Sequence, residues 1–195
     1  MEKLIWTPGA LLSPLPPALV TCGTAENPNI ITIGWTGILN SKPPKTYISV
    51  RPERYSYGLL KEHGEFVINL PPATIAKEVD LCGVRSGKSL NKFELCSFTP
   101  EKGSKVSVPS IAECPISIEC RITDSVLLGS HEMFVADILA VKVSPEVVND
   151  QGKLEIQKCN LLAYAHGTYF SLGKQLGTFG FSVRKKKKKT YKNKK

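Results

Sequence analysis

Hydrophobic and polar positions alternate most regularly in the second half of the chain. Every second residue from Ile116 to Ile122 is apolar, and the residues between them are Ser, Glu and Arg. A period of two predicts a strand with one buried face. Met133–Val143 is a long apolar stretch, and the turn residues Gly129–His131 precede it. The pattern therefore predicts a hairpin of two long strands.

The first half of the chain predicts shorter strands. A proline-rich, irregular lead-in covers residues 8–17, and Asn and Pro favour a turn at residues 26–29. Apolar and β-branched runs predict strands over Ala18–Thr24, Asn29–Trp35, Lys45–Val50 and Phe66–Leu70. The first two are expected to form a hairpin. Residues 153–165 are ambiguous, and residues 167–183, rich in Gly and aromatics, are expected to be irregular.

Helical spacing predicts single helices between these strands. They cover Tyr55–His63, Ile75–Cys82 and a short piece within Lys88–Ser97. Regular alternation of strands and helices is absent, and no G-x-G-x-x-G follows a strand, which disfavours a doubly wound parallel sheet. The sequence predicts a mainly β (α+β) domain, a small antiparallel barrel with peripheral helices.

Charge changes this picture only at the C-terminal end. The chain has 195 residues and a formal net charge of +9, but Arg184–Lys195 holds nine of its 26 cations and no acid. The other 17 cations match the 17 acidic residues. We therefore expect one neutral domain over residues 1–183 and a disordered Lys-rich tail over 184–195. No apolar run could span a bilayer and no signal peptide is evident, so a cytoplasmic protein is expected.

The cysteines and histidines do not predict a metal site or a disulfide framework. Six cysteines include no C-x-x-C pair, and the three histidines are scattered. Cys22, Cys120 and Cys159 lie in apolar segments and are expected in the core. Cys82 precedes Gly83 and is expected to be a buried cysteine at a helix end.

Cations and hydroxyls recur at predicted strand ends and in one glycine-containing loop. Arg makes bidentate contacts to phosphate, and Ser hydroxyls fill the remaining positions. A helix start after Arg51-Pro52 would add backbone N–H donors. Arg54 is expected to be a solvated surface charge, and Lys88 fits either a phosphate contact or a surface charge. The candidate phosphate ligands are Ser49, Arg51, Ser56, Ser86, Lys88 and Lys92.

Four residues could contact a flat heterocyclic ring. Trp35 could supply an aromatic neighbour, Thr36 a hydroxyl, and Gly37 a backbone N–H with close approach. Asn69, at the end of an apolar strand, could form a hydrogen bond with a ring edge. The alternatives are a core tryptophan and a strand-end asparagine in a turn.

The order of these motifs resembles the flavin reductase-like, FMN-binding split-barrel family, and most closely its flavoredoxin branch. The resemblance covers residues 11–181. The residues that carry it are Ile33-Gly-Trp-Thr-Gly37, Ser41-Lys-Pro-Pro44, Ser49-Val-Arg-Pro-Glu-Arg-Tyr-Ser56, Phe66-Val-Ile-Asn-Leu70, Cys82-Gly-Val-Arg-Ser-Gly-Lys88 with Lys92-Phe93, and Gly129-Ser-His131.

The resemblance implies a split β-barrel that binds FMN at a homodimer interface and transfers electrons to or from a redox protein through the flavin. No side chain is then expected to act as a nucleophile. The resulting set of candidate cofactor-binding residues is Asn29, Trp35, Thr36, Gly37, Ser49, Val50, Arg51, Ser56, Asn69, Ser86, Lys88, Lys92 and His131.

One departure from the family pattern bears on the electron donor. Nicotinamide-using members commonly show Gly-Asp-His where this chain has Gly129-Ser130-His131. The missing acid disfavours direct use of NAD(P)H. The alternative is an NAD(P)H-dependent flavin oxidoreductase that binds FMN and releases it. A nucleic-acid-associated protein held by Lys185–Lys189 is a weaker alternative, because the rest of the chain is neutral.

Overall fold

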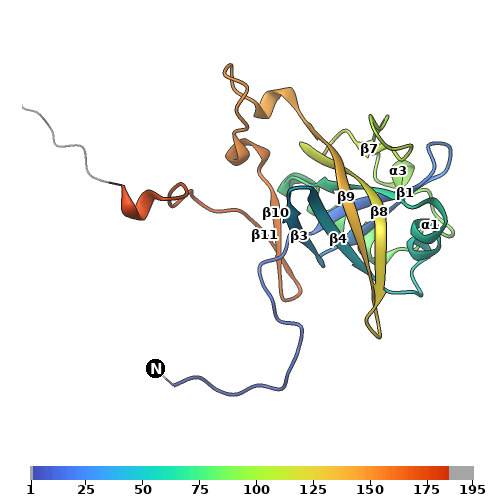
Figure 1. Ribbon diagram of the computed structural model, residues 1–195, viewed down its shortest axis with the longest axis horizontal. Coiled ribbons are helices and arrows are strands. Elements are labelled where there is room, and N and C mark those ends of the chain that lie inside the picture. Colours follow the sequence, from blue (N-terminus) through green and yellow to red (C-terminus); the bar gives the residue numbers. More distant parts are fainter. Residues whose placement is uncertain (1, 185–195) are drawn as a thin grey trace, which may run out of the picture.

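The computed structural model describes residues 2–184, which fold around one antiparallel sheet (Figure 1). Its strands are β1 (Ala18–Gly23), β2 (Pro28–Ile33), β3 (Thr36–Ser41), β4 (Pro44–Val50), β5 (Glu65–Leu70), β8 (Ile116–Leu127) and β9 (Glu132–Val143). The seven strands lie in the order β2-β1-β5-β8-β9-β4-β3. The predicted mainly β fold is confirmed.

The sheet curls until its two ends meet. β2 and β3 are consecutive in sequence and lie at opposite ends of the strand order. β2 approaches β4 at this point, and Trp35, between β2 and β3, extends the β3–β4 pairing by accepting a hydrogen bond from the amide of Ser49 at 2.9 Å. No ladder pairs β2 with β4 within the described residues, so the barrel is split along this line. The split exposes the ends of β2 and β4 side by side.

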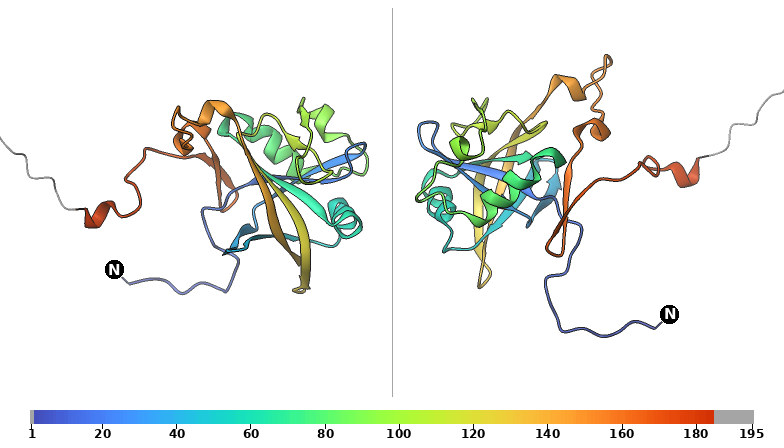
Figure 2. Two further views of the ribbon diagram at one scale, coloured as in Figure 1. Left: turned by 45° about the horizontal axis from the view of Figure 1, so that its top comes forward. Right: turned by 180° about the vertical axis from the view of Figure 1, so that it is seen from behind.

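Helices and short strands lie outside the barrel, and the last of them, close to the C-terminal end, stands away from it on an extended arm (Figure 2). They are α1 (Tyr55–His63), η1 (Ala73–Ile75), α2 (Ala76–Val84), α3 (Lys92–Leu95), β6 (Pro100–Glu101), β7 (Ser110–Ile111), η2 (Pro145–Val147), η3 (Ile156–Cys159), β10 (Leu162–Ala165), β11 (Thr168–Ser171) and η4 (Phe181–Val183). α1 ends at Gly64, which adopts a left-handed conformation with φ of 66°. α2 packs closely on β2, since a Cβ at Gly83 would lie 3.3 Å from the Cβ of Thr32.

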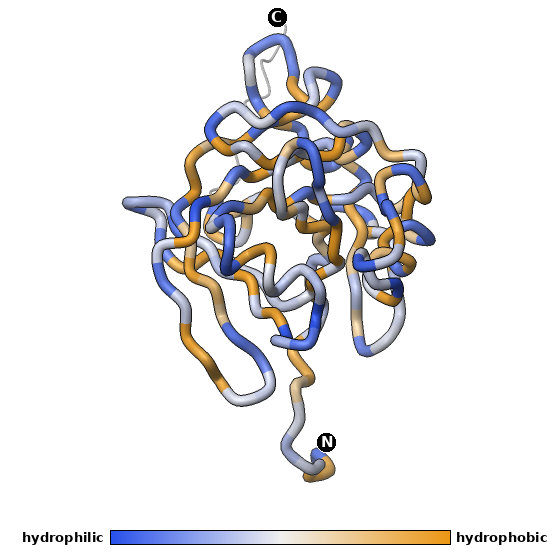
Figure 3. Tube along the Cα trace, turned by 90° about the vertical axis from the view of Figure 1, so that its right-hand side faces the viewer, coloured by the Kyte–Doolittle hydropathy of each residue, from blue (hydrophilic) through white to orange (hydrophobic). Residues whose placement is uncertain are grey.

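Two apolar clusters hold the barrel and its helices together. One fills the barrel interior, with Phe66 and Phe134 among its largest side chains. The other joins β1 and β2 to α2 and α3 through Val79, Cys82 and Phe93. Cys22, Cys120 and Cys159 are also buried, as predicted. Figure 3 shows hydrophobic stretches recurring around the barrel and on the N-terminal arm.

The structure corrects three predictions. β3 was not predicted, because its adjacent apolar residues Ile38 and Leu39 are both exposed on an edge strand and give no alternation. The range 167–183, expected to be irregular, contains β11 paired with β10. The prediction that only one face of β8 is buried is also wrong, because Glu119 on the other face is buried and a bulge follows it.

Loop residues covering β8 explain the burial of Glu119. Its carboxylate accepts hydrogen bonds from the backbone amides of Ser104 and Lys105. These donors offset the desolvation of the Glu119 carboxylate, which the alternating pattern had predicted to face solvent.

No described helix is both long and apolar enough to cross a membrane. The predicted disorder of the tail concerns residues that, apart from Arg184, lie outside the described range.

Candidate flavin site at the split of the barrel

Two adjoining cavities lie at the split, where β2 and β4 end. The first has a volume of about 340 Å³ and the second about 460 Å³. The two cavities share lining residues from β2, from the β4–α1 loop and from the end of α2. Those shared residues are Ile31, Arg51, Arg54, Gly83 and Val84. A single elongated ligand could therefore extend from one cavity into the other.

The second cavity is cationic. Arg51, Arg54 and Arg85 line it together with Lys92 and the hydroxyls of Ser56 and Ser86. Glu53, which is exposed and also lines the cavity, accepts from Arg51 at 3.5 Å, and Arg54 donates to the carbonyl of Gly83 at 3.4 Å. The described residues thus leave most of this positive charge without a close acidic partner. Such a cavity suits a phosphate.

Lys92 is the most informative residue of this cavity. Its side chain is 3% exposed, and Nζ donates to the carbonyls of Ile30 at 2.6 Å and Cys82 at 2.7 Å. No acidic side chain within residues 2–184 forms an ion pair with it. Burial lowers the pKa of Lys92, because the charged form loses solvation. An anion in the cavity would supply the missing counter-charge.

Backbone and hydroxyl donors surround the same cavity. Ser56, in the first turn of α1, is buried, and its hydroxyl accepts from Asn29 at 2.8 Å. No side chain caps the start of α1, and of its first three amides only that of Tyr57 donates within the described backbone, to the carbonyl of Arg54, so the amides of Tyr55 and Ser56 could serve an anion. Gly87 lies against Asn29, and a Cβ at Gly87 would come within 1.8 Å of Asn29 Oδ1. A larger residue at position 87 would have to displace the Asn29 side chain, which donates to Ser56.

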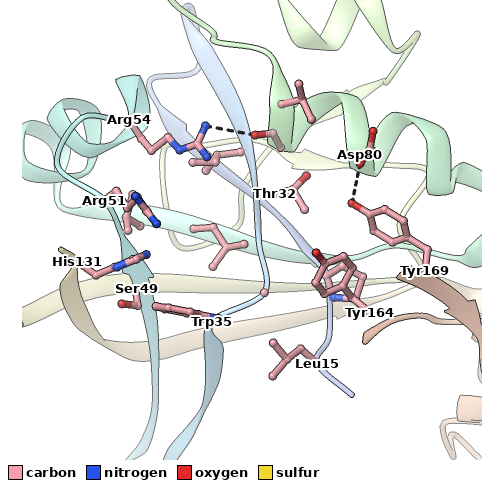
Figure 4. A pocket seen from close by; sticks show the side chains of 17 residues that line it. Leu15, Thr32, Trp35, Ser49, Arg51, Arg54, Asp80, His131, Tyr164 and Tyr169 are labelled. Carbon is pink, nitrogen blue, oxygen red and sulfur yellow. Dashed lines mark hydrogen bonds between the residues drawn. The ribbon is translucent and has the colours of Figure 1, made fainter. Parts of the chain in front are cut away.

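The first cavity has an aromatic wall next to Arg51. Trp35 follows β2, and its indole lies against the imidazole of His131, with ring centroids 4.4 Å apart and an interplanar angle of 33° (Figure 4). Ser49 and Val50 line the cavity beside them. Burial and the Arg51 charge lower the pKa of His131, so its imidazole is neutral at neutral pH. The wall offers a flat ring apolar contact and a neutral hydrogen-bonding group.

The opposite wall was not found from the sequence. It is formed by Tyr164 of β10, Tyr169 of β11, Asp80 of α2 and Leu15 of the lead-in. The tyrosine rings meet edge to face at 5.1 Å, and the Tyr169 hydroxyl donates to Asp80 at 3.2 Å. Apolar residues on both sides of His166-Gly167 were the hairpin signal that could have revealed this wall.

Most, not all, of the predicted residues lie at the two cavities. Trp35, Ser49, Val50, Arg51, Ser56, Ser86, Lys92 and His131 line them, and Asn29 lies directly behind Ser56. Arg54 is exposed, as expected for a surface charge, and it also lines both cavities. Lys88 is exposed and lines neither cavity.

Asn69, Thr36 and Gly37 lie elsewhere. Asn69 is fully buried within β5, where its side chain donates to the carbonyl of Leu19 and accepts from the amide of Ile111 and the hydroxyl of Ser117. The expected place at a ring edge is therefore wrong for Asn69, because these core partners already satisfy its amide. Thr36 and Gly37 belong to β3. The Thr36 hydroxyl donates to the carbonyl of Tyr47 at 2.6 Å.

The described residues contain no cluster of three or more potential metal ligands. All six cysteines are free. Cys82 is buried in the last turn of α2, as the sequence indicated. Burial raises the pKa of Cys82 to about 12, so this thiol is protonated and is not a reactive nucleophile at neutral pH.

Comparison with known proteins supports the resemblance noted from the sequence motifs. Residues 12–173 match the family described as flavin reductase like domain. An uncharacterized protein of Archaeoglobus fulgidus is 39% identical over 67% of this chain and 73% of its own length. An uncharacterized protein of Pyrococcus abyssi is 31% identical over 82% of this chain and 91% of its own length.

Solved structures agree with these sequence matches. The flavoredoxin of Desulfovibrio vulgaris (Miyazaki F) is 29% identical, with a TM-score of 0.86 over 94% of this chain and 100% of that structure. The flavoredoxin of Methanosarcina acetivorans is 26% identical, with a TM-score of 0.85 and the same coverage. These matches confirm the resemblance drawn from the motifs.

Proposed function

Because the chain belongs to the flavin reductase-like family, we propose that it binds FMN at the split of the barrel and transfers electrons through it. The observation that carries this proposal is the buried Lys92 ammonium, which faces the second cavity without an acidic partner among residues 2–184. Such a charge costs free energy unless a ligand anion compensates it.

The phosphate end of FMN fits the second cavity. A terminal phosphate carries up to two negative charges, and Arg51, Arg85 and Lys92 supply the cations. The phosphates of FAD are bridged and each carries one negative charge, so a dinegative terminal phosphate gains more from this cluster. The preference for FMN over FAD is thus part of the proposal.

The ring end of FMN fits the first cavity. The bound flavin supplies the one- and two-electron redox chemistry. The protein's contribution is to bind and orient it: Arg51 at the shared edge holds the anionic end, and Trp35 shields one side from water. His131, neutral at neutral pH, can donate or accept a hydrogen bond through the ring nitrogen that does not face Ser130, whose Oγ lies 2.9 Å from Nδ1.

An absorption spectrum of the purified protein tests the proposal. We expect a yellow protein or, after removal of bound flavin, tighter titration by FMN than by FAD. A colourless preparation that takes up neither flavin contradicts the proposed function. Equal affinity for both flavins contradicts only the proposed role of the second cavity.

A second candidate function is NAD(P)H-dependent flavin reduction with release of FMN. A protein named NADPH-flavin oxidoreductase, from Streptomyces viridifaciens, is 23% identical over 63% of this chain and 63% of its own length. A steady-state assay with NADH and excess FMN separates the two functions. Turnover of free FMN supports the reductase, and reduction of the bound flavin by a redox protein supports the electron carrier.

A homodimer is part of the same proposal. Apolar side chains project into solvent from the N-terminal segment before β1 and from the C-terminal segment after β11. Ile5 in the first is 99% exposed, and Leu176 in the second is 92% exposed. The edge strand β3 adds the exposed Ile38. A second copy of the chain would cover these residues. Light scattering coupled to size-exclusion chromatography tests whether the protein is a dimer.

The cytoplasmic location stays a prediction from the sequence.

A further inference from the structure

The wall of the first cavity formed by Tyr164, Tyr169 and Asp80 has no role in holding a phosphate. It lies across the cavity from Trp35 and His131 (Figure 4). Its parts come from α2 and from the separate β10–β11 hairpin, so tertiary folding alone brings them together.

Asp80 gives this wall a negative charge. Its carboxylate forms no ion pair within residues 2–184. Its one side-chain partner among these residues is the Tyr169 hydroxyl, which donates to Oδ1 at 3.2 Å. The other oxygen, Oδ2, accepts no hydrogen bond from another described side chain and is available to a ligand.

The Tyr169 hydroxyl is held as a donor. Burial, with the Asp80 charge as a further cause, raises the pKa of Tyr169 to about 12, so the phenol stays protonated at neutral pH. Its proton is directed to Asp80, and the ring of Tyr164 packs edge to face against it. The hydrogen bond restricts the Asp80 side chain, although the residue itself is exposed.

The cavity is therefore electrically asymmetric. Arg51 and Arg54 lie at one end, which adjoins the phosphate cavity, and Asp80 lies at the other. A phosphate in the second cavity would offset much of the positive charge at the arginine end, while Asp80 keeps the other end of the first cavity negative. Aromatic rings on both sides favour a planar ligand, and tyrosine faces also attract cations.

We propose that Asp80, positioned by Tyr169, determines the specificity of this cavity for a second ligand of the flavoprotein, a planar aromatic compound that carries positive charge or N–H donors. The inference rests on the proposed function, because a bound phosphate is needed to offset the positive charge of the arginine end. Anionic aromatic compounds of the same size are rejected by the Asp80 carboxylate.

Three nearly isosteric probes test this inference: benzamidine, which is cationic at neutral pH, benzamide, which is neutral, and benzoate, which is anionic. Calorimetric titration of the FMN-loaded protein measures their affinities, and shifts in the flavin absorption band report binding near the ring. We expect benzamidine to bind most tightly and benzoate most weakly. Asp80→Asn should weaken benzamidine by about fivefold, the range of a partly exposed ion pair, and change benzamide by less than about twofold.

Further variants separate the charge from the structural role. Asp80→Glu keeps the charge and should restore most of the preference for benzamidine. Tyr169→Phe removes the hydrogen bond and should weaken benzamidine less than Asp80→Asn does. The matched control is Asp150→Asn, which removes an exposed acidic charge from a turn that lines neither cavity. The control should leave all three affinities unchanged.

Two results would overturn the inference: tightest binding of benzoate, or an equal effect of Asp80→Asn and Asp150→Asn. Failure of all three probes to bind would overturn it as well. If the protein takes up no FMN, the proposed function fails by itself. The same titrations in the presence of inorganic phosphate, without flavin, then still decide the role of Asp80.

Discussion

The indole ring of Trp35 lies against the imidazole ring of His131, with centroids 4.4 Å apart. Trp35 follows β2 and His131 precedes β9, so this contact joins the edge of the split to the long hairpin. It lines the first cavity on the side of Arg51. Trp35 and His131, both in the set of candidate cofactor-binding residues, are therefore direct neighbours.

Lys92→Met should weaken FMN binding by about 1.5–3 kcal/mol, the range for a hydrogen bond to a charged group. Methionine keeps much of the side-chain volume and removes the ammonium. Arg51→Ala should have an effect of the same size. Fluorescence titration of flavin-free protein with FMN measures both changes.

Lys88→Met is the matched control for Lys92→Met. Lys88 lies on the neighbouring loop, is exposed and lines neither cavity. Its removal should leave the FMN dissociation constant nearly unchanged. Equal losses for the two lysines would show that general positive charge, and not the buried site, attracts the flavin.

Reduction by NADH and NADPH should be slow in the unmodified protein. Positioning of a hydride donor contributes much of the rate, and Ser130 stands where nicotinamide-using relatives carry an acid. Ser130→Asp should raise the NADH rate, and His131→Ala should perturb the flavin spectrum. Stopped-flow absorbance at about 450 nm, where oxidised flavin absorbs, follows the reaction. Rapid bleaching of the unmodified protein by NADH would favour the reductase function.

Asn69→Ala should destabilise the fold and leave the intrinsic FMN affinity unchanged. The substitution leaves the amide of Ile111 and the hydroxyl of Ser117 without their acceptor, at a cost of about 1–3 kcal/mol for each unpaired buried group. Urea unfolding measures the loss, and FMN titration well below the unfolding midpoint measures affinity. Strongly weakened FMN binding with unchanged stability would instead support a direct contact between Asn69 and the flavin.

Acid should destabilise the protein partly through Glu132. Hydrogen bonds from Ser125, Tyr57 and Lys61 lower its pKa from 4.5 to about 2. A carboxyl with a lowered pKa in the folded state contributes stability that is fully present above pH 4.5 and is lost as the pH falls towards 2. Glu132→Gln should therefore lower stability at neutral pH and flatten its decline in this window.

Urea unfolding at a series of pH values between neutrality and the acid limit of solubility measures this dependence. Glu26→Gln, at an exposed position in the β1–β2 turn, is the control and should keep the profile of the unmodified protein. A Glu132→Gln profile that is merely shifted down, with the same slope, would contradict the assignment.

The sequence by itself determined the local elements and the chemistry near them. Hairpin β1–β2, helix α1 and the long hairpin β8–β9 follow from short-range alternation, turn residues and helical spacing. Arg51, Ser56 and Ser86 could be assigned to one phosphate site because they stand after a strand, at a helix start and in a loop, where side chains are free to face a ligand.

Only the tertiary structure decided which polar groups face the cavities. Asn69 and Lys92 were both candidates for the cofactor site, yet burial gave the Asn69 side chain five protein partners and left the Lys92 ammonium next to a cavity. Asp80 and Tyr169 are 89 positions apart, and no local pattern predicts their contact. Local periodicity reports which face of an element is apolar, whereas long-range packing determines what that face meets.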